Sequence, residues 1–525
     1  MIEPQTIETK LTLTPEQASD KAFILKALNN KNLLKGKKIK SYRIIRKSID
    51  ARQNRVKVNL SLLISDEEEV KLKHTNKNYE PLPQEAPQIV IVGAGPAGLF
   101  AGLRAIELGL RPIIVERGKD VDNRRIDIAK ISREGKIDPN SNFCFGEGGA
   151  GAFSDGKLYT RSKKRGNIKE ILEILHQFGA SEDILVNSHP HVGSDKLPLI
   201  IKNIREKIQE SGGVIKFGCK MEEIIIDKGQ ATGIITSAGE KIKGAVFLAT
   251  GHSARDTFRM LRSKGVSIES KGIAIGVRLE HPQNLIDKIQ YHSAEGRGPY
   301  LPAAEYSFVN QTEGRGVYSF CMCPGGVIVP AVSDTNQIVV NGMSASARSG
   351  KWANSGYVVE LHPGDIKGYE AEGPFEMLAL QENLEKSFSQ ESKGSLNAPA
   401  QKIGDFIEGK LSDTLPSTSY APGIHPADFN QLFPKEIRER LKTGLKEIGK
   451  KCKDFSSNKG IMIGLESRTS SPIRIPRDPI TLQHTEIEDL YPVGEGAGYA
   501  GGIVSSALDG MNCIDAYYKK INNNG

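Results

Sequence analysis

The chain has 525 residues, enough for two to four domains, and its 38% hydrophobic and 26% charged residues are typical of a globular protein. Six cysteines are too few for a disulfide scaffold, and no apolar run approaches the roughly 18 residues of a membrane-spanning helix. Residues 1–6 lack the basic and apolar regions of a signal peptide. We therefore expect a cytoplasmic protein with no membrane partner.

The net charge of +8 is concentrated near the N-terminus. Residues 31–57 hold eleven Lys or Arg and one acidic residue, Asp50, whereas the rest of the chain has 60 basic and 62 acidic residues. We interpret the basic stretch as a solvated face or a subunit contact, with RNA or another polyanion as the alternative. Nucleic acid is not favoured, because no aromatic platform for single strands accompanies the charge.

The basic stretch belongs to a predicted small α+β module, residues 1–75. Its pattern predicts a strand at about 5–13, a helix opened by the capping box Thr14-Pro-Glu-Gln17, and two strands at about 39–47 and 54–64. A proline-punctuated linker at 76–87 follows.

Residues 89–98, IVIVGAGPAG, predict a buried parallel strand that turns sharply into a helix. Gly93 permits the turn, Gly95 permits the close approach of a pyrophosphate, and Gly98 lets the helix pack on the strand. A second apolar strand ends at Glu116, where a carboxylate accepts hydrogen bonds from ribose hydroxyls. The unit is typical of a site for the ADP half of a dinucleotide, and an acid at this position disfavours a 2′-phosphate.

A glycine-rich loop at 146–156 precedes Lys157 and is too flexible for a strand. We expect it to wrap a planar ring or a phosphate, with Lys157 available to the cofactor or to an acidic substrate; a plain surface loop is the alternative. His189 and His191 flank Pro190 ahead of a predicted helix at 195–211, in either a proton-transfer or a structural role.

Residues 245–252, AVFLATGH, predict another buried strand, which closes in Thr250-Gly251. Near the C-terminus, LYPVGEGAGYAGGIVSSALDG at 490–510 predicts a short strand, a glycine-rich turn that contains Glu495, and a helix. In two-part flavoproteins an acid at such a turn binds the ribityl chain, and the positive end of the following helix points at the flavin edge that gathers charge on reduction. The glycines at 496–501 also match the nucleotide-binding spacing, but we do not interpret them as a second nucleotide-binding domain, because no second strand and acid follow them.

These three elements, in this order, predict FAD; a Rossmann-like NAD domain without flavin is the alternative. The fold class is α/β, with an FAD/NAD(P)-binding Rossmann-like domain (three-layer ββα) at 88–255 and 461–525, an inserted α+β substrate domain at 256–460, and the N-terminal module. The expected cofactor contacts are Gly93, Gly95, Pro96, Ala97, Gly98, Glu116, Arg117, Gly149, Gly156, Thr250, Gly251, Gly494, Glu495, Gly501, Gly502 and Ile503.

Three further residues of the predicted substrate end invite a chemical interpretation. Arg468, just before the last flavin strand, is suited to bind a substrate carboxylate, with an ion pair to Glu466 or Asp478 as the alternative. Cys321 and Cys323 are interpreted as packing residues, with a catalytic dithiol or persulfide role as the alternative, since a disulfide between them requires a local turn. No further Cys or His lies at zinc spacing, so no metal is expected.

The chain resembles, nearly end to end, the family of FAD-dependent dehydrogenases often labelled NAD-utilising dehydrogenases, whose members are mostly uncharacterised. The segments that carry the resemblance are the fingerprint at 89–98, the C-terminal turn, RKSIDAR at 46–52, FGEGGAGAFSDGKL at 145–158, HVGSDKL at 191–197, SFCMCPGG at 319–326, NGMS at 341–344 and GLESRTSSP at 464–472. The resemblance implies a two-part FAD-binding fold of the glutathione-reductase type with an inserted domain, and no particular substrate.

The sequence thus favours an FAD-dependent oxidoreductase that acts on a small molecule, with Lys157, Arg468 and His191 as candidate catalytic residues. FAD is expected to bind non-covalently, and because one complete nucleotide unit is visible, any NAD(P)H is a transient donor. The alternatives are a flavin-dependent RNA-modifying enzyme and a non-catalytic flavin-binding redox sensor or scaffold. The oligomeric state, the donor and the acceptor stay open.

Overall fold

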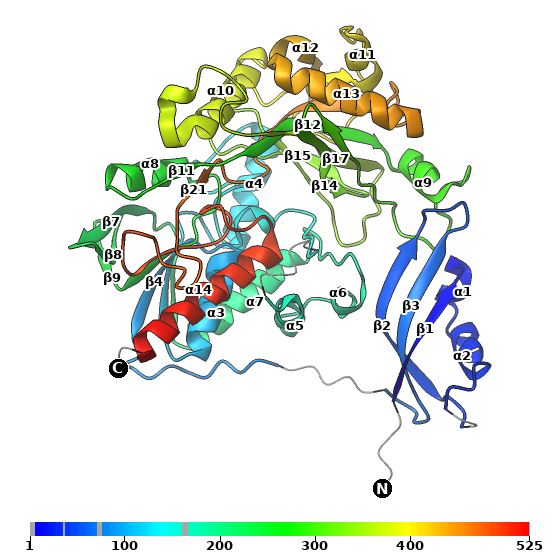
Figure 1. Ribbon diagram of the computed structural model, residues 1–525, viewed down its shortest axis with the longest axis horizontal. Helices are drawn as coiled ribbons and strands as arrows, with labels where there is room; N and C mark the ends of the chain where they lie inside the picture. Colours follow the sequence, from blue (N-terminus) through cyan, green and yellow to red (C-terminus); the bar gives the residue numbers. More distant parts are fainter. Residues whose placement is uncertain (1–5, 35–36, 71–75, 160–165, 524–525) are drawn as a thin grey trace.

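The computed structural model describes residues 6–34, 37–70, 76–159 and 166–523. Figure 1 shows three units: an N-terminal module, a Rossmann-like domain that contains both the blue strand β4 and the red C-terminal helix α14, and an inserted domain above it.

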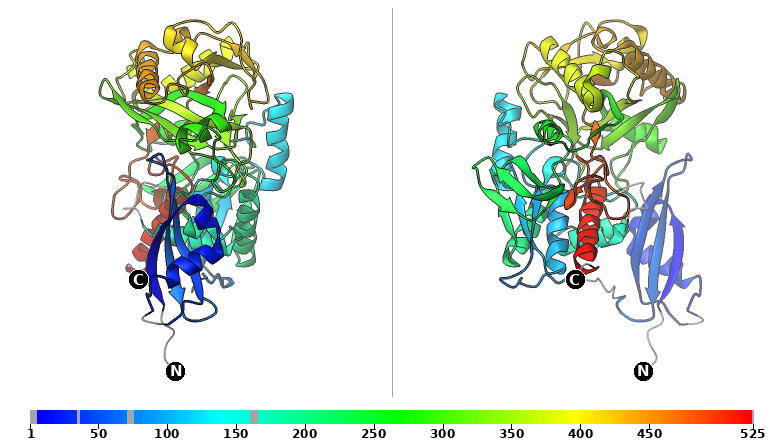
Figure 2. Two further views of the ribbon diagram at one scale, coloured as in Figure 1. Left: turned by 90° about the vertical axis from the view of Figure 1, so that its right-hand side faces the viewer. Right: turned by 60° about the vertical axis from the view of Figure 1, so that its left-hand side comes forward.

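The N-terminal module is an antiparallel sheet of order β1-β3-β2 covered by two short helices. Its elements are β1 (Ile7–Leu13), α1 (Pro15–Ser19), α2 (Lys21–Asn29), β2 (Ser41–Asp50) and β3 (Lys57–Ser65). The predicted capping box is confirmed, because the Gln17 amide donates to Thr14 Oγ1 at 3.2 Å and the Thr14 amide donates to Gln17 Oε1 at 3.1 Å. Figure 2 shows this module beside the rest of the molecule, which it contacts through β2, where the Ser188 amide donates to the Lys47 carbonyl at 3.0 Å.

The Rossmann-like domain is built on a five-stranded sheet of order β22-β10-β4-β5-β6 in which every pair is parallel. Its strands are β4 (Gln88–Val92), β5 (Arg111–Val115), β6 (Val214–Lys216), β10 (Ala245–Leu248) and β22 (Leu490–Pro492). Ile89 and Ile91 of β4 pack into one core with the helices, while Val90 and Val92 pack into a second core. Successive side chains of a strand point to opposite faces, so this sheet is covered on both sides.

The two covering layers differ in type. One contains α3 (Pro96–Glu107), α7 (Leu197–Glu210) and α14 (Ile503–Asn523), together with α5 (Ile168–Gln177) and α6 (Asp183–Val186). The other contains the antiparallel strands β7 (Met221–Asp227), β8 (Gln230–Thr236) and β9 (Lys241–Lys243), and α8 (Arg255–Ser263). A further helix, α4 (Val121–Glu134), follows β5 and packs toward the inserted domain.

The inserted domain has a seven-stranded sheet of order β13-β14-β17-β12-β20-β18-β19. The strands are β12 (Ile273–Pro282), β13 (Val309–Thr312), β14 (Arg315–Cys323), β17 (Trp352–Leu361), β18 (Ala398–Lys402), β19 (Ile424–Pro426) and β20 (Ile461–Glu466). Around this sheet lie the pair β15 (Val327–Pro330) and β16 (Val340–Met343), with α9 (Gln283–Tyr291), α10 (Glu376–Glu391), α11 (Ile403–Glu408), α12 (Phe429–Leu432) and α13 (Lys435–Lys451). The chain passes between the two domains twice, and the two connecting segments pair with each other through β11 (Glu269–Ser270) and β21 (Ile473–Arg474).

The boundary predicted at residue 460 is wrong by one strand. β20 pairs with β12 and β18 inside the inserted sheet, so the chain returns to the Rossmann-like domain after β20. At the other boundary, α8 packs on the Rossmann-like core, so the insertion effectively starts near β12. A short apolar strand fits either sheet, and its pattern carries no information about which neighbours it pairs with.

Within the described ranges, no helix combines the length and the hydropathy that are needed to cross a bilayer.

Candidate functional site

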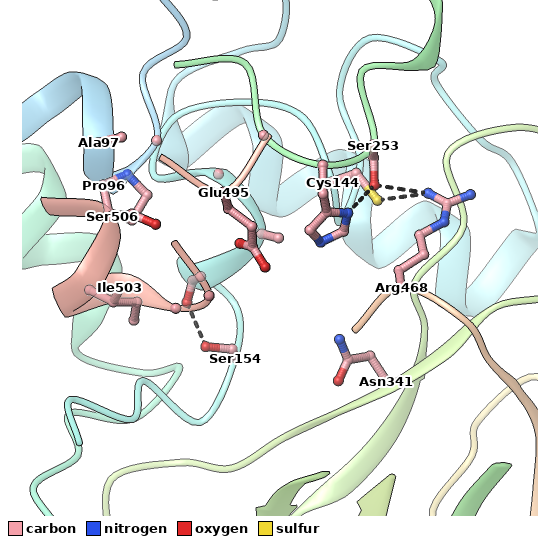
Figure 3. Close-up of a pocket in the computed structure, with 18 of the residues that line it drawn as sticks. Pro96, Ala97, Cys144, Ser154, Ser253, Asn341, Arg468, Glu495, Ile503 and Ser506 are labelled. Carbon is pink, nitrogen blue, oxygen red and sulfur yellow. Dashed lines mark hydrogen bonds between the residues drawn. The ribbon is translucent and has the colours of Figure 1, made fainter. Parts of the chain in front are cut away.

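A cavity of about 730 Å³ lies where the Rossmann-like domain meets the inserted domain. Its lining includes the fingerprint turn, the glycine-rich loop and the C-terminal turn on one side, and β14 with its neighbours on the other. Figure 3 shows part of this cavity, with Pro96, Ala97 and Ile503 at one end and Arg468 at the other. Of the expected cofactor contacts, all line the cavity except Gly98 and Gly494.

Glycine at each of the three fingerprint positions 93, 95 and 98 serves a different physical purpose. Gly93 has φ +108°, and a Cβ there would lie 2.4 Å from the Ala249 carbonyl oxygen. A Cβ on Gly98 would lie 1.9 Å from the Gly93 carbonyl oxygen, so its role is helix–strand packing behind the cavity. Gly95, in contrast, has φ −76°, and a Cβ there would meet only the Gly149 Cα, at 3.8 Å. The protein itself does not require glycine at position 95, which fits a ligand that comes close to the backbone.

Glu116 lies directly after β5 and is 5% exposed. Its carboxylate accepts hydrogen bonds from the amides of Ala94 at 2.9 Å, Gly118 at 2.9 Å and Gly146 at 3.0 Å. These bonds fix the carboxylate at the cavity wall, and its two oxygens retain capacity for a further donor such as a ribose hydroxyl.

Arg117, the next residue, lies over the Phe145 ring, 4.3 Å from its centroid, and pairs with Asp256 at 3.0 Å. Arg117 lines the cavity together with Cys219, Lys220 and Met221.

The C-terminal turn presents one carboxyl group and one helix end to the cavity. No hydrogen bond to the Glu495 carboxyl is found among the described residues, and Figure 3 shows this side chain between Pro96 and Arg468 with no bond drawn to it. Burial raises the pKa of Glu495 to about 7. Helix α14 begins at Ile503, and Gly501 and Gly502 leave its N-terminus open to the cavity. Such a terminus favours a negative charge in front of it.

We expect Glu495→Gln to remove part of the pH dependence of the stability of the apoprotein. Because the folded-state pKa of about 7 lies above the ordinary value of 4.5, the contribution of Glu495 is fully present below pH 4.5 and is lost as pH rises through about 7. The difference in unfolding free energy between wild type and variant should therefore change by up to about 3 kcal/mol across this window. Urea unfolding at several pH values measures it, and parallel curves for the two proteins would contradict the pKa.

The glycine-rich loop is held from behind by Arg124 of α4, which is 0% exposed. Its guanidinium donates to the carbonyls of Asn142 at 2.9 Å, Glu147 at 2.7 Å and Gly149 at 2.8 Å, and also to those of Phe143 and Gly146. The loop is therefore fixed in space, and the surface-loop alternative does not describe it. Gly149 and Gly156 both line the cavity.

Lys157 lies at the inserted-domain end of the cavity. Its Nζ donates to the Met322 carbonyl and lies 3.3 Å from Asp155 Oδ2 and 4.0 Å from Cys323 Sγ. Burial lowers the pKa of Lys157, but Cys323, Cys321 and Asp155 raise it overall, so the ammonium is charged.

An ion-pair chain that the sequence did not reveal continues from Asp155. Arg348 pairs with Asp155 at 2.5 Å and with Glu305 at 2.5 Å, and Glu305 also contacts His189 Nδ1 at 3.3 Å. The hydrogen bond to Glu305 raises the pKa of His189. No motif identifies Arg348 or Glu305, because their roles depend on partners 193 and 116 residues away in the chain.

The structure places His189, and not the predicted His191, on the cavity wall. His191 Nε2 is 3.1 Å from the Ser346 carbonyl oxygen, and burial followed by the charge of Arg348 lowers the pKa of this histidine. This arrangement favours the structural role that was the alternative for His191.

Arg468 reaches the cavity, but its donors are all engaged by protein groups. It forms a bidentate pair with Glu385 at 3.1 and 3.0 Å. Its remaining N–H groups contact Cys144, Ser253, Ser333 and Gln337. The ion pair is thus with Glu385 of α10 and not with Glu466 or Asp478, and Arg468 has no donor free for a substrate carboxylate in this state.

Comparisons with known proteins agree with this reading of the site. The family model "FAD-dependent protein, C-terminal domain-like" matches residues 272–469, the span from β12 to the end of β20, and a domain of unknown function matches residues 5–65. A Clostridium beijerinckii protein named only as uncharacterized is 40% identical over 496 residues, covering 91% of this chain and 92% of the relative.

Solved structures show weaker similarity. A geranylgeranyl bacteriochlorophyll reductase-like protein of Thermoplasma acidophilum has a TM-score of 0.35 at 12% identity, covering 83% of this chain and 80% of that chain. CtdE in complex with FAD and a substrate has a TM-score of 0.33 at 14% identity, covering 84% and 81%.

The open space at Gly95, the fixed Glu116 carboxylate, the unbonded Glu495 carboxyl and the exposed end of α14 fit an extended dinucleotide that carries a flavin. With the family match and the relative that spans nearly the whole chain, they lead to one conclusion: the chain belongs to a family of FAD-dependent proteins, and its cofactor is FAD.

Proposed function

We propose that the protein is an FAD-dependent oxidoreductase in which a small-molecule substrate enters the same cavity as the cofactor, between the Rossmann-like and inserted domains. The observation that carries this proposal is the composition of the cavity wall. One side is nucleotide-binding backbone, and the other holds titratable side chains, namely Lys157 and His189 of the Rossmann-like part of the chain and Glu305, Cys321 and Arg348 of the inserted domain. Clefts at domain interfaces with convergent polar groups are the usual place for such a site.

When bound, FAD supplies two-electron hydride chemistry. The residues of the chain bind and orient the cofactor and screen it from water. Gly93 to Ala97 and Glu116 would hold the ADP half, the N-terminus of α14 would stabilise negative charge at its end of the cavity, and Glu495 would hold or release a proton near neutral pH. Lys157 and the Asp155–Arg348–Glu305–His189 chain fix the wall against which the substrate packs.

The finer classification follows from the same residues. The fingerprint, the strand β10 that ends in Thr250-Gly251, and the C-terminal turn support a two-part fold of the glutathione-reductase type. All six cysteines are free thiols in the structure, which supports a reducing, cytoplasmic location.

An anaerobic titration of the purified holoprotein with NADH and NADPH, followed by the visible flavin spectrum, tests the proposal. Rapid bleaching by either nucleotide identifies a nicotinamide-driven reductase. A flavin that stays oxidised with both nucleotides but bleaches with a small-molecule substrate identifies a dehydrogenase. A bound flavin that no donor reduces would overturn the oxidoreductase proposal in favour of a redox sensor or scaffold.

A further inference from the structure

Two cysteines lie where β14 reaches the cavity. β14 pairs with β17 as far as Phe320, and the pairing resumes at Cys323 after a bulge. Inside the bulge, Cys321 has φ +45°, a left-handed conformation that residues other than glycine seldom adopt. Strained residues of this kind cluster at active sites. Cys321 lines the cavity, and Cys323 is fully buried behind it.

Two cations hold this segment. Arg278 of β12, which is 0% exposed, donates to the Cys321 carbonyl at 2.7 Å and lies 3.3 Å from Cys323 Sγ. Lys157 donates to the Met322 carbonyl from the cavity side. The carboxylate partner of Arg278 is Glu466, at 3.2 Å, and burial raises the pKa of Glu466 to about 7. The positive charge around the two sulfurs is therefore incompletely compensated.

The two thiols have opposite tendencies to ionise. Hydrogen bonding with Cys323, followed by the charges of Lys157 and Arg278, holds the pKa of Cys321 well below its ordinary value, although burial opposes this. The same contact and burial raise the pKa of Cys323. The charged or titratable groups that face the pair are Asp155, Lys157, Arg278, Glu466 and Glu495. Cys321, which lines the cavity, is therefore the more acidic of the two thiols.

We propose that Cys321 is the nucleophile of a thiol–disulfide exchange centre, that Cys323 is its resolving thiol, and that a small disulfide is the substrate class. This inference rests on the proposed function, which places two-electron chemistry in the same cavity. Three observations carry it: Cys321 lines the cavity in a left-handed bulge, Cys323 lies two residues away, and the buried Arg278 and the partly exposed Lys157 contact this segment.

The exchange balances in atoms and electrons. The Cys321 thiolate attacks one sulfur of the disulfide, the substrate S–S bond breaks, and one thiolate leaves and takes up a proton from solvent. The Cys323 thiol then loses its proton and attacks Cys321 Sγ, and the second substrate sulfur leaves as a thiol. The substrate gains two electrons and two protons, and the cysteine pair becomes a disulfide.

Mass spectrometry of the holoprotein after treatment with bis(2-hydroxyethyl) disulfide tests the exchange. We expect the wild type to lose two hydrogens and peptide mapping to find a Cys321–Cys323 disulfide. Cys323→Ser should stop at a mixed disulfide with mercaptoethanol on Cys321, and Cys321→Ser should leave Cys323 unmodified. Cys452→Ser, at a half-buried cysteine outside the cavity, is the matched control and should react like wild type. Modification at Cys144 with Cys321 untouched, or no modification of either Cys321 or Cys323, overturns the proposal.

The pH profile of alkylation by iodoacetamide separates a nucleophile from an accessible packing residue. We expect the labelling midpoint of Cys321 to lie below the ordinary thiol value near 8.5, and Lys157→Met to move it upward. A wild-type midpoint at the ordinary value overturns the proposal, whether or not the lysine variant folds.

The same samples distinguish this inference from the proposed function. A flavin that is reduced by its donor while Cys321 stays inert disproves the exchange centre and leaves the oxidoreductase standing. Reactive cysteines in a protein whose flavin accepts electrons from no donor disprove the oxidoreductase and leave the exchange chemistry standing.

Discussion

Gly95→Ala should abolish stoichiometric FAD binding while the protein stays folded. The backbone at Gly95 is acceptable for alanine, and the added Cβ would meet only the Gly149 Cα at 3.8 Å, an ordinary contact. The space that it fills is the space in which we expect the pyrophosphate to approach the backbone. We expect FAD to bind at least about a hundredfold more weakly, or about 2.8 kcal/mol. Flavin content after desalting and fluorescence titration of the apoprotein measure the effect.

Two other glycines serve as controls for this variant. Gly93→Ala should prevent folding, because its Cβ would lie 2.4 Å from the Ala249 carbonyl oxygen. Gly109→Ala should keep its FAD and lose about 1 kcal/mol, since Gly109 has φ +74° but has no atom within 4 Å of the added Cβ. A Gly95→Ala protein that retains FAD like wild type would show that the cofactor does not pass this turn.

Glu385→Ala should destabilise the protein more than any single surface change. Glu385 is 0% exposed and pairs with Arg255 of α8 at 2.7 Å and with Arg468 at 3.0 Å. Removing it leaves two arginines buried without their carboxylate, which costs about 3–5 kcal/mol. Because Arg255 belongs to the Rossmann-like domain and Glu385 to the inserted domain, flavin retention should fall as well. Urea unfolding and flavin release on heating measure the two effects.

Glu382→Ala is the matched control for Glu385→Ala. Glu382 lies on the same helix, α10, and pairs at 2.6 Å with Arg259 of α8, which is 52% exposed, whereas its distance to the buried Arg255 is 3.9 Å. The change should cost no more than about 1 kcal/mol. Equal losses in the two variants would contradict the buried ion pair.

Protonation of Glu385 at low pH should destabilise the wild type in the same way as the Glu385→Ala change. Burial opposes the ionisation of Glu385, but Arg255 and Arg468 lower its pKa to about 2, below the ordinary value of 4.5. The stabilisation is therefore present above pH 4.5 and is lost as pH falls through about 2. The Glu385→Ala protein should lack this part of the acid transition.

The cofactor half of the site was predictable because local sequence dictates it. A strand, a turn that only glycine tolerates, a helix and an acid lie within one short unit, and Thr250-Gly251 and Glu495 each follow a short buried strand. Their positions at the carboxyl ends of parallel strands bring them to one edge of the sheet whatever the insertion does.

The substrate half was not predictable, because its contacts join distant segments. Arg468 pairs with Glu385 on a helix of the inserted domain, 83 residues away in the chain, and neither local sequence predicts this ion pair. The left-handed bulge at Cys321 arises from its pairing with β17, which the Cys-Met-Cys pattern does not encode. The assignment of β20 to the wrong domain has the same origin, since a strand's neighbours are set by tertiary packing.

The strand order β22-β10-β4-β5-β6 also constrains how the protein is made. β22 pairs with β10 about 244 residues after it in the chain, and the turn with Glu495 and helix α14 follow β22. A growing chain emerges at about 5–20 residues per second, so the FAD site stays incomplete until β22 and α14 have been synthesised, after the whole inserted domain. Uptake of FAD thus follows the emergence of every strand of the inserted sheet.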